Sequence, residues 1–342
     1  MTLYDRVADL ELVIDDHRYE RLEQATRRFT RVSTVVVLAG RGEEGRGEDV
    51  IYDPTAHDAL PTADLRGSHT IRSLSARLDA MDAFPGVDEV PPMWQAMADY
   101  RRWAFESAAL DLALRQEGCS LGTLLGQEYH PVRFCVSAGD PEEWLQHDPT
   151  MEFKLDATPD WSREYMERLQ ATGRVACVDL KSYYEGTVVD NPPEPTLYRN
   201  VVECFPDAVI EDAKPTDATR AILEPAAQRL SWDAPVHSLA DVLALPFPAR
   251  VLNIKPSRFG TLERLLETIE HCQREGIALY GGGQFELGPG RYQIQALASL
   301  FYPEGGNDVA PGVFNTTPPG PGLPSSPLPV PERPHGFAFG DR

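Results

Sequence analysis

The stretch VLNIKPSRFG, residues 251–260, decides how the second half of this chain folds. Its first four residues are mostly apolar and are typical of a buried β-strand. Lys255 comes next, and Pro256 after it cannot donate the backbone hydrogen bond that a central strand requires. The strand therefore ends at Lys255, and we expect this lysine to point at whatever lies beyond the sheet.

The same pattern, an apolar strand that ends in charged residues, recurs along the chain from residue 131. The charges are Lys154 in MEFKLDAT, Asp179 and Lys181 in VACVDLKSYY, Glu211 in DAVIEDAKP, Asp233 in QRLSWDAPVHS, and Lys255. Helix-like stretches such as TLERLLETIEHCQREG separate the strands, so each interval fits one βα unit. Repeated βα units imply a parallel sheet, and this many favour a barrel whose strand-end charges share one rim.

The first 130 residues follow a different pattern. RFTRVSTVVVLAGRGEEGRGEDVIYD predicts a hairpin with an apolar strand, a Gly/Glu-rich turn and a second short strand. YRRWAFESAALDLALRQEG predicts an amphipathic helix that Gly118 ends. We therefore expect an α+β domain over residues 1–130, a barrel over 131–312, and a Pro/Gly-rich extended tail over 313–342 that returns to the first domain.

Composition excludes several classes of function. The chain has 342 residues, enough for two domains, and a net charge of −21, which argues against binding to nucleic acid or to an anionic membrane. Its five cysteines are scattered without a Cys-x-x-Cys pair, which indicates a reducing compartment and no structural zinc or disulfide framework. The sequence shows no spanning apolar run and no signal pattern at its start, so we expect a cytoplasmic protein.

Three of the strand-end charges are carboxylates on consecutive strands. Asp179, Glu211 and Asp233 would present oxygen ligands to a hard dication such as Mg²⁺ and leave positions for water or substrate. Lysines on either side of them could serve as acid/base groups. The alternative is a rim of carboxylates that pair with Lys154, Lys181 and Lys214 without any metal.

The chain resembles the enolase superfamily, in particular its muconate-lactonising-enzyme-like subgroup with the o-succinylbenzoate synthases and N-acylamino-acid racemases. FESAALDLALRQEGCSLGTLLG is similar to the last helix of that family's capping domain, and GRGEDVIYD to the Gly-x-Gly-Glu turn of its capping hairpin. VLNIKPSRFGTLERLLE and YGGGQFELGPGRYQIQALASL resemble its sixth- and seventh-strand segments, and NDVAPG its eighth. The likeness runs over nearly the whole chain.

The resemblance implies a modified TIM barrel of the (β/α)₇β type under an α+β capping domain. It also implies an isomerase or lyase that binds Mg²⁺ and removes the proton α to the carboxylate of a small-molecule substrate through an enediolate. Dehydration, cycloisomerisation and racemisation all use this step, and a homo-oligomer is usual. Lys255 matches the strand-six lysine, either as a general acid/base whose neutral form its cationic neighbours favour or as a cation that holds the enediolate.

The chain also departs from the family pattern. Lys154 matches the first lysine of the strand-two Lys-x-Lys pair, but Asp156 stands in place of the second, and Lys181 stands where strand three usually has asparagine. We expect Asp156 to pair with Lys181, which makes Lys181 either a second acid/base or a structural residue. Ala213 and Ala234 stand where proline and glutamate are usual.

These departures keep two other hypotheses open. One is a barrel that only binds a small ligand without catalysis, and the other is a metal-independent enzyme that uses Lys154, Lys181 and Lys255 electrostatically. The resemblance also implies that specificity comes from capping-domain loops that close over the barrel, here within residues 10–30 and 50–70.

Overall fold

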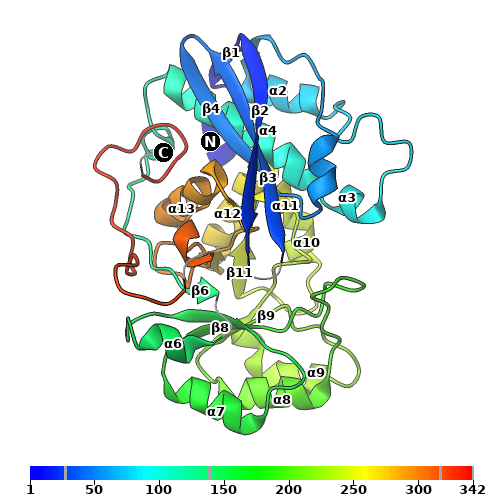
Figure 1. Cartoon of the computed structure of the whole chain (residues 1–342), viewed down its shortest axis with the longest axis vertical. Coiled ribbons are helices and arrows are strands. Elements are labelled where there is room, and N and C mark those ends of the chain that lie inside the picture. The colour runs from blue at the N-terminus through cyan, green and yellow to red at the C-terminus, as the bar shows by residue number, and fades with distance from the viewer. Residues whose placement is uncertain (27–28, 138–139, 316–317, 341–342) are drawn as a thin grey trace.

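The computed structural model describes residues 1–26, 29–137, 140–315 and 318–340. Residues 27–28 of the expected specificity loop, and 316–317 and 341–342 of the expected tail, lie outside the described residues. Figure 1 shows antiparallel strands and helices in the upper part of the molecule and a parallel barrel below them. None of the helices in the described ranges is long and apolar enough to cross a membrane.

The upper part is built from the N-terminal elements. They are α1 (Leu3–Ala8), β1 (Glu11–Ile14), β2 (Asp16–Ala25), β3 (Thr30–Gly40), β4 (Glu43–Asp49), η1 (Pro54–Asp58), β5 (Gly67–Thr70), α2 (Ile71–Leu78), α3 (Pro92–Ala96), α4 (Ala98–Gln116) and α5 (Leu121–Leu125). β2, β3 and β4 form one antiparallel sheet, and β1 pairs with β5 in a second. We call this part the cap.

The barrel is built from the elements that follow. They are β6 (Val136–Ser137), α6 (Pro141–Leu145), β7 (Phe153–Asp156), α7 (Arg163–Ala171), β8 (Val175–Asp179), α8 (Pro195–Cys204), β9 (Val209–Glu211), α9 (Arg220–Leu223), η2 (Glu224–Arg229), β10 (Leu230–Ser231), α10 (Leu239–Leu243), β11 (Val251–Ile254), α11 (Pro256–Phe259), α12 (Leu262–Glu275), β12 (Ala278–Gly281), α13 (Pro289–Phe301) and η3 (Gly312–Asn315). Strands and helices alternate as the sequence predicts, and Gly276 in the left-handed conformation ends α12.

The hairpin of the cap differs in one respect from the expectation. The turn is short, at Arg41 and Gly42, and the Gly-Arg-Gly-Glu stretch lies inside β4 instead of in the turn. The reason is packing against α4, because a Cβ atom on Gly45 or Gly47 would lie 2.2 Å or 2.0 Å from a backbone oxygen of that helix. The two glycines therefore let the buried helix lie directly on the strand.

The barrel closes through short pairings. β6 to β10 form a parallel sheet in sequence order, and β11 pairs in parallel with β12. The backbone N–H of Asn253 donates to Trp232 O at 3.3 Å and joins the two sheets. Asn307 bridges to Phe134 and Asp308 to Gly282, so the segment around residues 307–308 occupies the eighth strand position. All strands point the same way, and their carboxyl ends meet at one mouth.

Glu48 joins the cap to the barrel at the start of α13. Its carboxylate accepts hydrogen bonds from the backbone N–H groups of Leu287, Gly288 and Gly290 at 2.6, 2.9 and 3.0 Å, and from the Ser33 hydroxyl at 2.6 Å. The N-terminus of a helix carries unsatisfied N–H groups and partial positive charge, so a buried carboxylate is stabilised there. The cap thus supplies the capping group of a barrel helix.

Arg31 makes a second junction. Its guanidinium is fully buried and donates to Val50 O and Ile51 O in the cap, both at 2.7 Å. The same group donates to Gln284 O at 3.0 Å and Phe285 O at 3.1 Å, which follow β12 at the barrel mouth. One side chain therefore fixes the position of the cap relative to the loop after the seventh strand.

The C-terminal tail contacts both parts. The N–H of Leu121 donates to Gly336 O at 3.1 Å, and the N–H of Phe337 donates to the Asp111 side chain at 2.9 Å. Phe337 is fully buried, and the N–H of Phe339 donates to Tyr292 O on α13. The tail therefore runs back to α4 and α5, while the domain limits at residues 130 and 312 stay a prediction.

The Glu48 junction leads to a stability prediction. In Glu48→Ala, three backbone N–H groups lose their acceptor in a buried place, so we expect the free energy of unfolding to fall by about 3 kcal/mol. Urea unfolding measures the loss. Glu23→Ala is the matched control, because Glu23 is exposed in β2 and its ion pair with Arg21 contributes little. Equal losses in both variants would contradict the role of Glu48.

His57 gives a pH prediction. It is 3% exposed, its Nε2 contacts Ile51 O at 3.0 Å and its Nδ1 contacts the Thr34 hydroxyl at 2.9 Å. Burial lowers the pKa of His57 in the fold, with Asp49 opposing, whereas the unfolded chain protonates near its ordinary value of about 6.5. Stability is therefore full above that value and is lost as pH falls toward the lower pKa of the folded state.

The measurement is urea unfolding at a series of pH values from 7 to 5. We expect the free energy of unfolding to fall less steeply in His57→Gln than in the unsubstituted chain, because the glutamine does not titrate. Identical slopes in the two proteins would show that His57 does not contribute to the acid sensitivity.

Candidate active site at the carboxyl ends of the barrel strands

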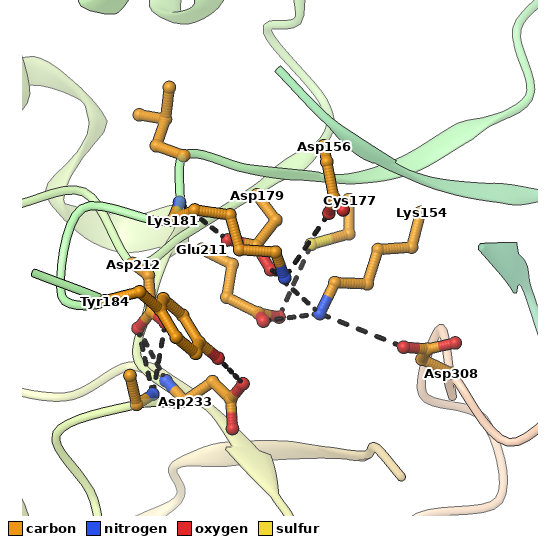
Figure 2. A network of polar contacts seen from close by, with 12 residues as sticks. Lys154, Asp156, Cys177, Asp179, Lys181, Tyr184, Glu211, Asp212, Asp233 and Asp308 are labelled. Carbon is orange, nitrogen blue, oxygen red and sulfur yellow. Dashed lines mark hydrogen bonds and ion pairs between the residues drawn. The ribbon is translucent and has the colours of Figure 1, made fainter. Parts of the chain in front are cut away.

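Buried charges gather at the mouth of the barrel, where the strands end. We call this set the barrel-mouth cluster; its members are Lys154, Asp179, Lys181, Glu211, Asp212, Asp233, Lys255 and Arg258. All of them except Lys181 are at most 6% exposed. Each of the six site residues that the sequence predicts is a member, and Figure 2 shows most of the network.

Lys154 lies between two carboxylates. Its Nζ is 3.2 Å from Asp179 Oδ2, it donates to Glu211 Oε1, and it is 3.9 Å from Asp308 Oδ2 (Figure 2). Burial lowers the pKa of Lys154, but the carboxylates of Glu211 and Asp179 outweigh it and hold the pKa well above its ordinary value. Lys154 is therefore an ammonium ion.

Glu211 is held on its other side by neutral groups. Its Oε2 accepts hydrogen bonds from the Tyr280 hydroxyl and from Asn253 Nδ2, the latter at 3.1 Å. Burial raises the pKa of Glu211 to about 7, although Lys154 opposes this change. The carboxylate is thus fixed by β11 and β12, and its remaining oxygen is directed at Lys154.

Asp179 is the second partner of Lys154 and also binds Lys181. Its Oδ2 contacts the Lys181 Nζ, and its Oδ1 accepts from the Lys181 backbone N–H at 2.9 Å. Burial raises the pKa of Asp179, but Lys181 and Lys154 outweigh it and hold the pKa below its ordinary range. Asp179 is therefore a carboxylate between two ammonium groups.

Asp233 pairs with two other cations, Lys255 and Arg258. Lys255 Nζ lies 2.8 Å from its Oδ2, Arg258 Nε lies 2.9 Å from its Oδ1, and the Tyr184 hydroxyl donates to Oδ2 at 2.9 Å. Burial lowers the pKa of Lys255, but Asp233 outweighs it, so the pKa lies above its ordinary value. This direction suits the role of Lys255 as a cation, whereas the neutral form depends on the added charge of a bound metal and stays a prediction.

Asp212 was not among the predicted site residues. Among the described residues, Asp179, Glu211 and Asp212 form the one buried group whose ligand oxygens all lie within 4.8 Å of one another. Asp212 has φ of 53°, and its Oδ1 accepts from the backbone N–H of Asp233 at 2.8 Å. Burial, Asp233 and Asp179 raise its pKa well above the ordinary value.

This donor set suits a hard dication, because it is made of buried carboxylate oxygens. Asp179 and Glu211 belong to the group, as expected. Their oxygens, like both oxygens of Asp233, already have hydrogen-bond or cationic partners, with which a bound dication would compete. Asp233 as the third ligand stays a prediction, and Asp212 offers an alternative oxygen.

Lys181 reaches from the cluster toward a cavity. It has φ of 53°, and its Nζ lies 3.4 Å from Asp156 Oδ1, so the expected pair with Asp156 is present. Its side chain is 17% exposed, the most open in the cluster. Lys214, weighed from the sequence as another partner of the acids, contacts Glu185 instead.

The cavity has a volume of about 1020 Å³ and lies between the cap and the barrel mouth. Lys181 is the one cationic side chain among the described residues that line it, and Asp156 lies beside this lysine. Phe29 from the cap and Phe285 after β12 pack against each other in the wall of this cavity, with ring centroids 6.1 Å apart. The segment of residues 10–30 contributes to the lining as expected, whereas no described lining residue comes from 50–70.

Sequence reasoning missed Arg258, Tyr184, Tyr280 and Asp308 as well as Asp212. Two signals were present: Arg258 follows Lys255 in the same KPSR stretch, and Asp308 is the second residue of the NDVAPG segment on the eighth strand position. Tyr184 and Tyr280 carry no such signal, because their roles depend on which strand lies beside which.

Comparisons with known proteins place this chain in a protein family. Models of a domain of unknown function (DUF8230) match the chain over residues 5–124 for the N-terminal domain and 128–316 for the C-terminal domain. A search of curated proteins found no match.

Solved structures show the fold. A dipeptide epimerase from Methylococcus capsulatus complexed with Mg ion is 20% identical, with a TM-score of 0.68 over 97% of this chain and 100% of that chain. A muconate cycloisomerase from Pseudomonas fluorescens is 16% identical, with a TM-score of 0.66 over 90% of each chain. An enolase-superfamily member from Listeria innocua is 18% identical, with a TM-score of 0.67 over 90% of this chain and 88% of that chain.

These structures confirm the predicted fold class, a modified TIM barrel with an N-terminal α+β cap, and the resemblance to the muconate-lactonising-enzyme-like subgroup at the level of the fold. The chain belongs to the DUF8230 family, and its fold is that of the enolase superfamily.

Proposed function

We propose that this protein is an isomerase or lyase that removes the proton α to the carboxylate of a small-molecule substrate. The observation that carries the proposal is the barrel-mouth cluster, in which lysine ammonium groups and buried carboxylates meet beside a cavity of about 1020 Å³. Barrel enzymes carry their chemistry at this face. The neighbours named as a cycloisomerase and an epimerase support the same class of reaction.

We further propose that the site takes Mg²⁺. Asp179 and Glu211 would hold it, with Asp233 as the predicted third ligand and Asp212 as the alternative. When bound, the ion would stabilise the negative charge that develops on the substrate carboxylate as the α proton leaves. The Mg ion in the dipeptide epimerase structure supports this assignment.

The lysines would do the proton transfer and hold the charge. Lys181 is the ammonium group that reaches the cavity, so it is placed to contact the substrate. Lys255 lies deeper, on the carboxylate of Asp233. To act as the base it would first lose its own proton to solvent and then take the α proton, while the C–H electron pair passes into the enediolate. If Lys255 stays a cation, it would only balance the enediolate charge, and Lys181 in its neutral form would be the base. Dehydration and cycloisomerisation require one such group, whereas racemisation requires Lys181 as well.

A metal-independent enzyme is the second candidate function. The observation in its favour is that Asp233 already has two cationic partners, Lys255 at 2.8 Å and Arg258 at 2.9 Å. Four protein cations could then provide the positive charge that a dication provides elsewhere. Turnover that persists unchanged after exhaustive chelation would favour this candidate over the Mg²⁺ enzyme.

Exchange of the α proton tests the proposed role of Lys255. We expect a carboxylate library incubated with the protein and Mg²⁺ in D₂O to yield substrates whose α proton exchanges, detected by NMR and mass spectrometry. Exchange should fall at least 100-fold in Lys255→Ala, in line with the loss of an acid/base group. Lys214→Ala, a lysine that contacts Glu185 outside the cluster, is the control and should exchange normally. A complete absence of exchange would favour the non-catalytic ligand-binding barrel.

Turnover of Lys181→Met tests whether the cation that reaches the cavity takes part in the reaction. We expect Lys181→Met to lower turnover at least tenfold on any substrate that the screen finds, because it removes the cation that reaches the cavity. Turnover equal to that of the unsubstituted protein would limit Lys181 to a structural role as the partner of Asp179 and Asp156. Circular dichroism of the variant checks that the fold is kept.

A further inference from the structure

Lys154 stands where its charge conflicts with a bound metal ion. Its ammonium group contacts Asp179 Oδ2 at 3.2 Å and also Glu211 Oε1, two of the oxygens proposed to hold Mg²⁺. Positive charges repel strongly in a buried place, so an ammonium group and a dication on the same carboxylates weaken each other's binding. Movement of one of the groups when the metal binds would relieve this repulsion.

The carboxylates are not free to move. Glu211 Oε2 is held by Asn253 at 3.1 Å and by the Tyr280 hydroxyl, and Asp179 Oδ1 is held by the Lys181 backbone N–H at 2.9 Å. These groups come from three different strand ends. Swinging Glu211 away would take the acceptor from Asn253 Nδ2, and swinging Asp179 away would take it from the Lys181 backbone N–H. The long lysine side chain is the part of the contact that can adopt another rotamer.

The carboxylate of Asp308 could pair with the Lys154 ammonium group in place of Asp179 and Glu211. Asp308, on the eighth strand position, has its Oδ2 3.9 Å from Lys154 Nζ, and its side chain is 21% exposed (Figure 2). Asp308 is therefore nearer the solvent side of the mouth than the almost fully buried Asp179 and Glu211. A short movement would bring Lys154 onto Asp308 without leaving the ammonium unpaired.

We propose that Lys154 is a built-in cation that competes with Mg²⁺ for Asp179 and Glu211, and that metal binding moves its ammonium group to Asp308. The inference rests on the proposed metal site. It implies an order of binding, because the ammonium turns toward the mouth and a substrate carboxylate only once the metal is in place.

The test measures how tightly the protein binds Mg²⁺ in the absence of substrate, by isothermal titration calorimetry. Binding of Mn²⁺ is measured in parallel by electron paramagnetic resonance, which counts the free ion directly. We expect Lys154→Met to bind both ions at least tenfold more tightly than the unsubstituted protein, because the competing charge is gone. Lys154→Gln serves where the methionine variant fails to fold, since its amide still donates to a carboxylate. Lys214→Met is the matched control and should bind as the unsubstituted protein does.

Asp308→Asn tests the second half of the proposal. We expect it to weaken Mg²⁺ binding severalfold in the unsubstituted background and to have a much smaller effect in the Lys154→Met background, because Asp308 acts by receiving the lysine. Equal effects in both backgrounds would show that Asp308 acts only through its charge and would overturn the receiving role.

The outcomes separate the inference from the proposed function. Equal or weaker Mg²⁺ binding in Lys154→Met, with clear binding by the unsubstituted protein, would overturn the competition and leave the metal site standing. Failure of both proteins to bind either ion would overturn the competition and the metal-dependent function together.

Discussion

The charge balance of the barrel-mouth cluster is the constraint on which the site depends. Four acidic and four basic side chains lie at the ends of neighbouring strands, nearly all of them buried, and each isolated charge would cost several kcal/mol there. The pairings lower that cost. Those of Lys154 with Asp179 and Glu211, and of Lys255 and Arg258 with Asp233, also fix the geometry, because their partners come from different strands. The same pairings decide what can enter. An added dication would compete with the four cations for the carboxylates, and Lys181 is the cation of the cluster that lines the cavity.

The cap matters because it positions the walls of the cavity. Glu48 caps α13, and Arg31 holds the carbonyl groups of Gln284 and Phe285 just before that helix. The cap therefore holds the loop after β12. In this loop Phe285 has a left-handed backbone, with φ of 59°, and its ring packs against that of the cap residue Phe29. Strain of this kind persists only where surrounding contacts hold it. The cap therefore positions the loop after β12 and contributes Phe29 to the lining of the cavity.

The sequence was informative wherever a local rule determines structure. Lys255 before Pro256 predicted a strand end, apolar spacing predicted α4 and α12, and the recurring strand-end charges predicted a barrel with one charged rim. The contacts across the mouth could not be predicted, because they depend on side-chain reach between strands. Lys154 binds Asp179 and Glu211 together, Arg258 binds Asp233, and Asp212 turns inward through a left-handed backbone. The effect of Asp233 on Lys255 was missed for the same reason, since that carboxylate outweighs burial and the nearby cations and raises the pKa of the lysine.

A crystal structure of the protein grown with Mg²⁺ tests the account most directly, because it shows the metal and the lysine in one experiment. The account predicts an ion bound by oxygens of Asp179 and Glu211, with the Lys154 ammonium group turned away from them and paired with Asp308. An ion-free cluster, with Lys154 still between the two carboxylates at a saturating Mg²⁺ concentration, would contradict it.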